Sequence, residues 1–387
     1  MRDKRSLRAM RLRRIAALAS LLHIAQGFHT PPKRTLMPQL HASEAKRDLP
    51  APAYLLGASA LWATYPSTIK CLFAAPGSAI SPGEATLLRF VVMAVATSSA
   101  LPAAPVDDAA PAPLADQLER RVPSSVYVAA LELGALGLAG TLCNTAGLAR
   151  IPALTGAVVL TSLNVWTPLI AACAGATAAE RAVDATTWAL CAVALAASAY
   201  ALVPDASANV FEVPAFGAGE LGCLAASFFF AAAKVRLSSH LKIHDADALT
   251  SGRVVAQCGL AAAGLGLADE TNALHELLPS ERGGLGVGLP AVLGESEAWL
   301  AGLSGPQLFW VAASALLSGA GALFCQSRGQ ARVPAPTAQL YFSTQPIFVA
   351  LWAFALLREP VTRHEVAGGA ALLLGLAAAR RGTQVNG

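Results

Sequence analysis

Charged residues are scarce in this chain, and that scarcity excludes an ordinary soluble domain. Asp, Glu, Lys and Arg make up 13% of the 387 residues, against about 25% in average soluble domains. Hydrophobic residues make up 55%, and the mean hydropathy is +0.52. The Lys and Arg residues beyond the N-terminus are scattered, so no nucleic-acid surface is expected. The composition predicts a protein embedded in a lipid bilayer.

The sequence also lacks the signatures of common enzymes and metal sites. No HExxH, GxSxG or P-loop pattern occurs, and the histidines and carboxylates form no cluster at catalytic spacing. The seven cysteines include no CxxC pair and fall in apolar segments, where they are expected to act as packing residues. We therefore expect no enzymatic activity, no metal and no cofactor. An integral-membrane enzyme is the alternative from a different class.

The first fifty residues have the composition of a targeting sequence. Residues 1–14 are rich in Lys and Arg, and an apolar run from Ile15 to Ala25 ends in Ala-Gln-Gly, which predicts a signal peptide over 1–27. Residues 28–50 begin with Phe28 and are basic, hydroxylated and almost free of acid until Glu44. This arrangement resembles the bipartite presequence of algae with secondary plastids, so a plastid envelope is expected. The alternative is a secretory signal that leads to the plasma membrane or an endomembrane.

Ten apolar stretches are long enough to cross a bilayer, which takes about 20 residues. They are 53–74, 83–104, 124–148, 153–178 and 185–203, followed by 217–237, 246–268, 306–329, 334–357 and 364–380. Backbone groups in hydrocarbon must be paired within their own segment, so these stretches are predicted to be helices. They divide the chain into a first half, 51–203, and a second half, 217–381.

The two halves repeat each other. Lys70 and Arg89 recur as Lys234 and Arg253, and the spacing within each pair is the same. The stretch ARIPALTGA at 149–157 recurs as ARVPAPTAQ at 331–339, at a somewhat larger offset because the loop before it is longer in the second half. With five segments in each half, the halves must cross the membrane in opposite directions. Inverted repeats of this kind are typical of membrane transporters.

Three sequence motifs resemble the EamA branch of the drug/metabolite transporter superfamily. They are ALWATYP at 60–66, LNVWTPLIAACAG around Pro168 and QLYFSTQPIFVALWAFALLREPV at 339–361. The stretches 132–160 and 329–346 look closer still to plastid-type members of algae and plants. The resemblance implies an all-α membrane protein with ten transmembrane helices, arranged as two inverted five-helix EamA repeats around a central substrate site.

The resemblance also implies secondary-active transport of a small organic metabolite by alternating access. A phosphate-translocator-like exchanger of phosphorylated metabolites is the alternative within this class, but the Lys-Arg pair of those relatives is missing from FSTQPIFVALWAF. The expected partners are a small-molecule solute and lipid, and a homodimer is left open. One departure concerns the fourth helix: the distance from Thr155 to Pro168 is longer than the distance from Thr337 to Pro346. This predicts about one extra turn in the first half.

Four cations are candidate ligands for an anionic cargo. Arg89 and Arg253 lie about six residues inside their helices within a shared Thr-x-x-Arg pattern, and Lys70 and Lys234 lie near the ends of the preceding helices. Charges inside a bilayer are costly unless they face water, a partner or a cargo. We predict two cationic vestibules, with Lys70 and Arg89 toward one membrane face and Lys234 and Arg253 toward the other. The alternative is snorkelling to the interface.

Other polar residues are candidates for contact with the cargo, for coupling or for hinge motion. Glu132 is a candidate coupling carboxylate; alternatively it pairs with an Arg or lies near a helix start that favours acid. The prolines Pro66, Pro168 and Pro346 are candidate hinges. The substrate-binding candidates beside the cations are Asn144, Gln326, Gln330 and Tyr341, with Asn164, Trp166 and Gln339 nearby. These amides and aromatics either bind a polar cargo or join helices to one another.

Overall fold

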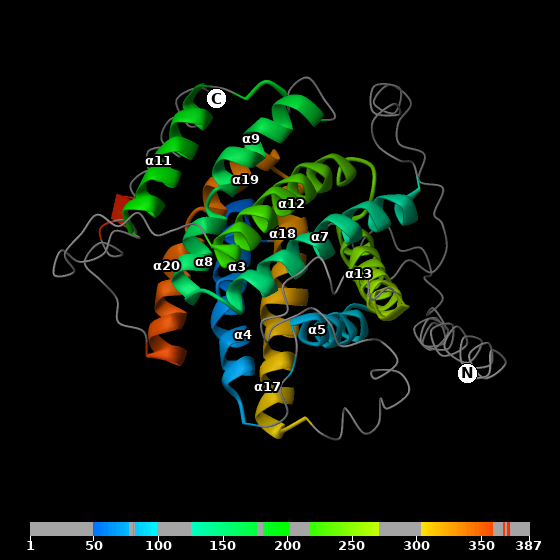
Figure 1. Ribbon diagram of the computed structural model, residues 1–387. Helices are drawn as coiled ribbons and strands as arrows, with labels where there is room; N and C mark the ends of the chain where they lie inside the picture. Colours follow the sequence, from blue (N-terminus) through cyan, green and yellow to red (C-terminus); the bar gives the residue numbers. More distant parts are fainter. Residues whose placement is uncertain are drawn as a thin grey trace.

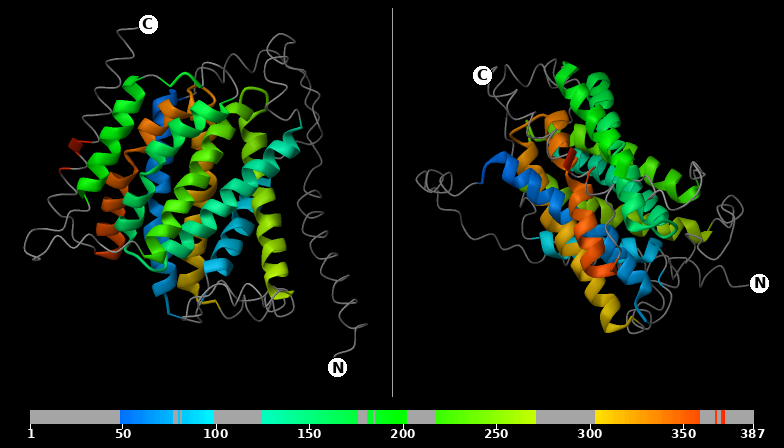
Figure 2. Two further views of the ribbon diagram at one scale, coloured as in Figure 1. Left: turned by 45° about the horizontal axis from the view of Figure 1, so that its top comes forward. Right: turned by 90° about the vertical axis from the view of Figure 1, so that its left-hand side faces the viewer.

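The computed structural model is a helical bundle in which two groups of helices share one interior. It describes residues 49–76, 80, 82–98, 125–175, 181–183, 185–201, 217–270, 303–358, 367 and 370–371, and no strand occurs among them. Most helices run roughly side by side along one direction (Figure 2). Residues 1–48, which include all but the last two residues of the predicted targeting sequence 1–50, lie outside the described residues, as does most of the predicted span 364–380.

Helices of the first half coincide with its predicted spans. They are α3 (Ala51–Trp62), α4 (Thr64–Ala74), α5 (Pro82–Thr97), α7 (Val126–Leu148), α8 (Ala153–Leu160), α9 (Leu163–Ala174) and α11 (Ala185–Ala201). The predicted first span is interrupted at Ala63, between α3 and α4. Pro66 follows that point, and its missing N–H removes the usual i+4 donor of the carbonyl four residues earlier, at Trp62.

The described helices of the second half coincide with four of its five predicted spans. They are α12 (Ala218–His240), α13 (Ala246–Glu270), α17 (Gly305–Ala313), the π-helical segment η2 (Ser314–Gly321), α18 (Ala322–Gln330), α19 (Ala335–Phe342), α20 (Gln345–Trp352) and the π-helical segment η3 (Ala353–Leu357). Five continuous or nearly continuous helices in the described residues are long and apolar enough to cross a membrane: Val126–Leu148, Ala153–Ala174, Ala218–His240, Gly305–Gln330 and Ala335–Leu357.

The fourth helix of each half is interrupted at the same place in the repeat. In the first half, Thr161 and Ser162 separate α8 from α9, and their hydroxyls donate to Val158 O at 2.6 Å and Val159 O at 2.8 Å. In the second half, Ser343 and Thr344 occupy the equivalent positions and separate α19 from α20. Hydroxyls that bond back to the preceding turn bend helices.

The prediction of an extra turn in the first half is therefore wrong. Both α8 and α19 have 8 residues and both follow a proline, Pro152 or Pro334. What differs is the place of the later proline: Pro346 lies at the start of α20, whereas Pro168 lies inside α9. The break is made by the Ser/Thr pair, and the proline has moved along the helix by about one turn.

The halves exchange packing partners across the bundle. In the first half, α3 belongs to the first span and packs on α18 of the second half. In the second half, α12 is the first helix and packs on α7 of the first half. The second helices, α5 and α13, pack on each other. In Figure 1, α7 and α12 lie alongside each other, as do α3 and α18. The interior is thus built from both halves.

Glycines let α7 and α12 approach closely. A Cβ added at Gly147 would lie 2.7 Å from the backbone oxygen of Gly219 and 2.7 Å from Cys223 Sγ. A Cβ at Gly222 would lie 2.9 Å from Cys143 O. Small residues at helix crossings are the usual means of tight association in a bilayer.

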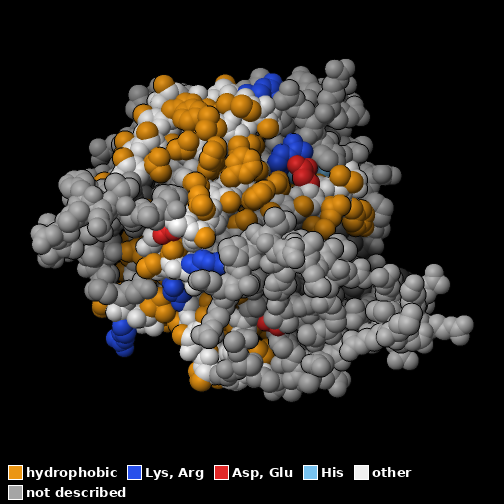
Figure 3. Space-filling view, in the orientation of Figure 1, with side chains coloured by type: hydrophobic (Ala, Val, Ile, Leu, Met, Phe, Trp, Pro, Cys, Tyr) orange, Lys and Arg blue, Asp and Glu red, His pale blue; other side chains and the backbone are white. Residues whose placement is uncertain are grey.

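The outer faces of the bundle are apolar. Large hydrophobic side chains such as Tyr127 and Leu131 on α7, Phe228 on α12, Phe309 on α17 and Phe354 on η3 are exposed. Figure 3 shows hydrophobic side chains spread over one such face, with few charged ones between them. A surface of this kind suits lipid tails.

Candidate functional site

The interior contains a cavity of about 120 Å³ between the two halves. Three cations line it, Arg89 from α5, Lys234 from α12 and Arg253 from α13, and no Asp or Glu of the described residues does. The uncharged polar lining is Thr141, Asn144, Gln257, Ser318, Gln326 and Gln345, and the aromatic lining is Trp62, Tyr65, Phe90 and Phe230. The cavity therefore combines positive charge with amides and apolar walls.

Arg89 is held by the third helix of the other half. Its Nε donates to Ser314 O and its Nη2 to Ser318 Oγ, each at 3.4 Å. Its guanidinium carbon lies 4.8 Å from the centre of the Tyr65 ring, a cation–π contact. Ser314 and Ser318 both belong to η2, and π-helical segments often occur at functional sites.

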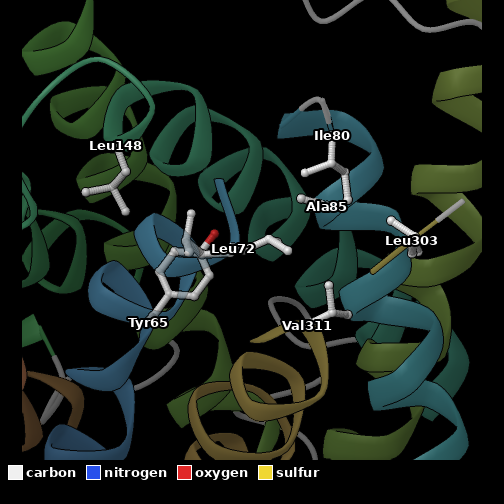
Figure 4. Close-up of a cluster of buried hydrophobic side chains, with 8 residues drawn as sticks. Tyr65, Leu72, Ile80, Ala85, Leu148, Leu303 and Val311 are labelled. Carbon is white, nitrogen blue, oxygen red and sulfur yellow. The ribbon is translucent and has the colours of Figure 1, made fainter. Parts of the chain in front are cut away.

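Tyr65 connects the cavity to an apolar cluster at one end of the bundle. Its hydroxyl hydrogen-bonds to Thr145 Oγ1 at 2.6 Å. Figure 4 shows its ring with Leu72, Leu148, Val311 and the other members of the cluster. These side chains come from α4, α7 and α17, among other elements, and so join these elements through apolar contacts.

Arg253 and Gln257 carry hydrogen-bonding groups that have no partner in the part of the chain that the structure describes. Arg253 Nη2 donates to Gln326 Oε1 at 3.2 Å and to Leu323 O at 3.4 Å. Its Nε has no partner there, and neither has Gln257 Oε1, although both residues are buried. A buried donor and acceptor without partners are costly, and here both belong to residues that line the cavity.

Lys234 is buried between the two halves. Its ammonium donates to Gln339 Oε1 at 2.9 Å and lies 4.5 Å from the Phe342 ring centre and 5.1 Å from that of Trp62. Gln339 in turn donates to Asn164 Oδ1 at 2.9 Å. These contacts connect α12 to α3, α19 and α9, so the ammonium group has neighbours from several helices. None of the three cations forms an ion pair with a carboxylate among the described residues.

Repeat-equivalent residues meet in this cavity. Arg89 and Arg253 line it together, as do Asn144 and Gln326, which occupy equivalent positions in the third helices of the two halves. The Thr-x-x-Arg pattern has the same contact in each half: Thr86 Oγ1 lies 3.4 Å from Thr145 Oγ1, and Thr250 Oγ1 lies 2.6 Å from Ser327 Oγ. In each half, the threonine therefore joins the second helix to the third at a point one helical turn before the arginine.

The expected pair of vestibules is not what the structure shows. Arg89, Lys234 and Arg253 line one cavity, and Lys70 is half-buried and is not among the lining residues. The first helix is interrupted at Ala63 before it reaches Lys70, whereas α12 runs unbroken through the equivalent position to Lys234. The repeat in sequence therefore does not extend to the placement of the two lysines.

Other predicted residues lie behind or outside the cavity wall. Gln330 is buried; it accepts from Gln326 Nε2 at 2.6 Å and donates to Lys234 O at 3.3 Å. Tyr341 packs on the cluster that holds Leu55 and Phe342. Glu132 pairs with Arg236 through two hydrogen bonds and lies 3.1 Å from His240 Nε2. Of the interpretations of Glu132, the arginine partner is what the structure shows.

Sequence reasoning missed Gln257, Tyr65 and Phe230. Gln257 lies one turn after Arg253, so the i, i+4 spacing of a helix could have indicated it. Tyr65 lies within the motif ALWATYP, directly before Pro66. Phe230 occupies the space left by Gly140, where a Cβ would lie 2.6 Å from its ring, and no sequence signal indicates that contact. Among the described residues, no group of three or more His, Cys, Asp or Glu is placed to hold a metal.

Comparison with known proteins agrees with this architecture. Residues 284–380, within the second half of the chain, are similar to the EamA-like transporter family. A solved structure titled "Crystal structure of protein" is similar over 85% of this chain and 96% of that chain, with a TM-score of 0.55 and 16% sequence identity, which shows a shared fold. No curated protein sequence matches the chain.

The family similarity and the apolar helices together define a class of protein. The chain is a multi-pass integral membrane protein in which residues 284–380 are similar to a family of transporters. Proteins of the EamA family are transporters rather than enzymes.

Proposed function

We propose that this protein is a secondary-active carrier that moves a small organic anion across a membrane by alternating access. One observation carries the proposal: three cationic side chains, and no carboxylate of the described residues, line a cavity between the two halves. Buried charges cost several kcal/mol each, so a cavity with three of them suits a ligand of opposite charge.

The size of the cavity limits the cargo. A water molecule needs about 10–15 Å³ of comparable volume, so 120 Å³ corresponds to on the order of ten non-hydrogen atoms. The unpartnered groups of Arg253 and Gln257 offer one donor and one acceptor to such a solute.

The movement that we propose uses the interrupted helices. Ala63, Thr161–Ser162 and Ser343–Thr344 are points where the backbone can change direction without breaking a continuous hydrogen-bond ladder. Pro66, Pro168 and Pro346 are proposed as hinges beside or beyond these points. The exchange of packing partners between the halves supports an inverted repeat, in which one half rocks against the other.

Two further elements of the proposal come from the sequence. Glu132 is proposed to couple transport to protons, because protonation would release Arg236 on α12 from the first half. A plastid membrane is proposed as the location from the presequence. A fluorescent fusion of the full chain in an alga with secondary plastids tests the location, and plasma-membrane fluorescence would contradict it.

Uptake into liposomes tests the proposed function. Purified protein should accumulate organic acids or sugar phosphates more than amino acids that carry no net charge. Arg89→Gln and Arg253→Gln should each lower anion uptake about tenfold or more, since a hydrogen bond to a charged group contributes about 1.5–3 kcal/mol. The control is Arg150→Gln, because Arg150 is exposed and its guanidinium donates to Ala146 O on the turn before it.

Two results would reject the proposal. One is uptake of a cation or a neutral solute that both cavity variants leave undiminished. The other is a loss of uptake in the Arg150→Gln control equal to that in the cavity variants. Uptake of sugar phosphates with release of inorganic phosphate would instead favour the phosphate-translocator-like exchanger.

A further inference from the structure

The cavity holds its two guanidinium groups at separate places along one helix. Arg89 donates hydrogen bonds to Ser314 and Ser318 in η2. Arg253 donates hydrogen bonds to Leu323 and Gln326 in α18, which continues the same helix. The nearest of these partners, Ser318 and Leu323, are five residues apart, which corresponds to at most about 7–8 Å along the axis at the α-helical rise of about 1.5 Å per residue. The third helix of the second half thus acts as a spacer between two cations.

Each guanidinium group keeps hydrogen-bonding capacity for a ligand. A guanidinium has five N–H donors, and Arg89 uses Nε and Nη2 in contacts of 3.4 Å, longer than the usual distance of about 2.9–3.0 Å. Arg253 uses Nη2 in contacts of 3.2 and 3.4 Å, and its Nε has no partner among the described residues. Both side chains are less than a tenth exposed. An oxyanion could therefore bind at either group without displacing a short hydrogen bond.

The surroundings of Arg89 also favour a separate oxyanion group at each arginine. Arg89 is covered by the rings of Tyr65 and Phe90, at 4.8 and 5.8 Å from its guanidinium carbon. A guanidinium offers paired N–H donors in its plane, which is the geometry for a bidentate carboxylate. Two arginines that are bound at separate places along one helix cannot both bind a single carboxylate in bidentate geometry.

We infer that the cargo carries two oxyanion groups at the ends of a short carbon chain, one for Arg89 and one for Arg253. This inference rests on the proposed function and narrows its substrate class to small dianions such as dicarboxylates. The apolar wall residues Met93, Phe230 and Leu323 then face the carbon chain, and Lys234 adds a third positive charge.

Ligand-induced stabilisation tests the inference without relying on transport. The purified full-length protein is titrated with malonate, succinate, glutarate and adipate, each compared with the monocarboxylate of equal carbon number and with inorganic phosphate. A ligand that binds the folded state raises the melting temperature, and a tighter ligand raises it further at equal concentration. Dicarboxylates should bind about tenfold tighter or more than matched monocarboxylates, with one preferred chain length.

Variants of each arginine, tested with both ligand types, show which guanidinium group binds which carboxylate. Arg89→Gln should weaken the best dicarboxylate about tenfold or more, and should change the affinity of the matched monocarboxylate by about threefold or less, because that ligand can bind at Arg253. Arg253→Gln should show the same pattern. Arg150→Gln serves as the control and should change neither affinity.

The outcomes separate the inference from the proposed function. Equal binding of matched dicarboxylates and monocarboxylates, or equal weakening of both by each variant, would overturn the two-ended cargo. Tighter binding of inorganic phosphate than of every dicarboxylate would also overturn it, since that result indicates one concentrated anion site. Failure of the inference leaves anion uptake into liposomes intact, whereas failure of the proposed function abolishes that uptake for every anion.

Discussion

Lys234 offers the sharpest test of the balance between stability and function in this cavity. A buried ammonium loses several kcal/mol of hydration. Its hydrogen bond to Gln339 returns about 1.5–3 kcal/mol, and the two rings of Trp62 and Phe342 return about 0.5–2 kcal/mol each. These opposing contributions nearly cancel, so the charge adds little to stability and its value must lie in binding.

Three variants separate the contributions. Gln339→Leu leaves the ammonium with only its ring contacts and should destabilise the protein by about 1–3 kcal/mol. Lys234→Met leaves Gln339 Oε1 without its donor and should change stability by about 1 kcal/mol or less. The double variant removes both polar groups and should be about 1–3 kcal/mol more stable than Gln339→Leu. Asn164 Oδ1 keeps a donor throughout, from Ser343 Oγ at 2.7 Å.

Thermal unfolding in detergent measures the stability of these variants, and uptake into liposomes measures their transport of the anion. At about 2–4 °C per kcal/mol, the double variant should melt a few degrees above Gln339→Leu. Anion uptake should fall about tenfold or more wherever Lys234 is replaced, and Lys70→Met should keep uptake because Lys70 does not line the cavity. A double variant that melts below Gln339→Leu would refute the stability reasoning, and Lys234→Met with unchanged uptake would refute the role in binding.

Three other perturbations probe the packing, the hinges and the coupling. Gly147→Ala places a Cβ 2.7 Å from the Gly219 backbone oxygen and should destabilise the protein by about 1–3 kcal/mol. Gly259→Ala, with nothing within 4 Å of the added Cβ, should stabilise the protein by up to about 1 kcal/mol. Equal shifts in melting temperature would contradict the close α7–α12 contact. Pro168→Ala and Pro346→Ala should change the turnover of uptake more than the apparent affinity, and the reverse would argue against hinges. Glu132→Gln should abolish the dependence of uptake on an imposed pH gradient, and an unchanged dependence would exclude Glu132 as the coupling residue.

Much of the helical architecture could be predicted because a bilayer leaves few alternatives. A backbone in hydrocarbon must form helices of a fixed minimum length, so runs such as 124–148 and 217–237 nearly coincide with α7 and α12. The internal repeat also located equivalent residues, and Arg89, Arg253, Asn144 and Gln326 do meet in the cavity.

The rotation of each helix could not be predicted in the same way. Helices such as α7 and α12 carry apolar residues on every side, so no periodic face indicates which residues look inward. Gln330 is one turn from Gln326, yet it bonds to the backbone of Lys234 behind the wall. Lys70 and Lys234 repeat in sequence, but only one of them lines the cavity.

The sequence by itself determined that this protein crosses a membrane many times, with a few costly charges kept inside, and it predicted two related halves. Composition and spacing decide this, because hydrocarbon tolerates charge and unpaired backbone poorly. Only the tertiary structure decided that three of those charges surround a single cavity. Their meeting follows from the packing of α5 on α13 and of α12 and α13 on α7, with glycine contacts between α7 and α12, and this long-range packing is not encoded by any local pattern.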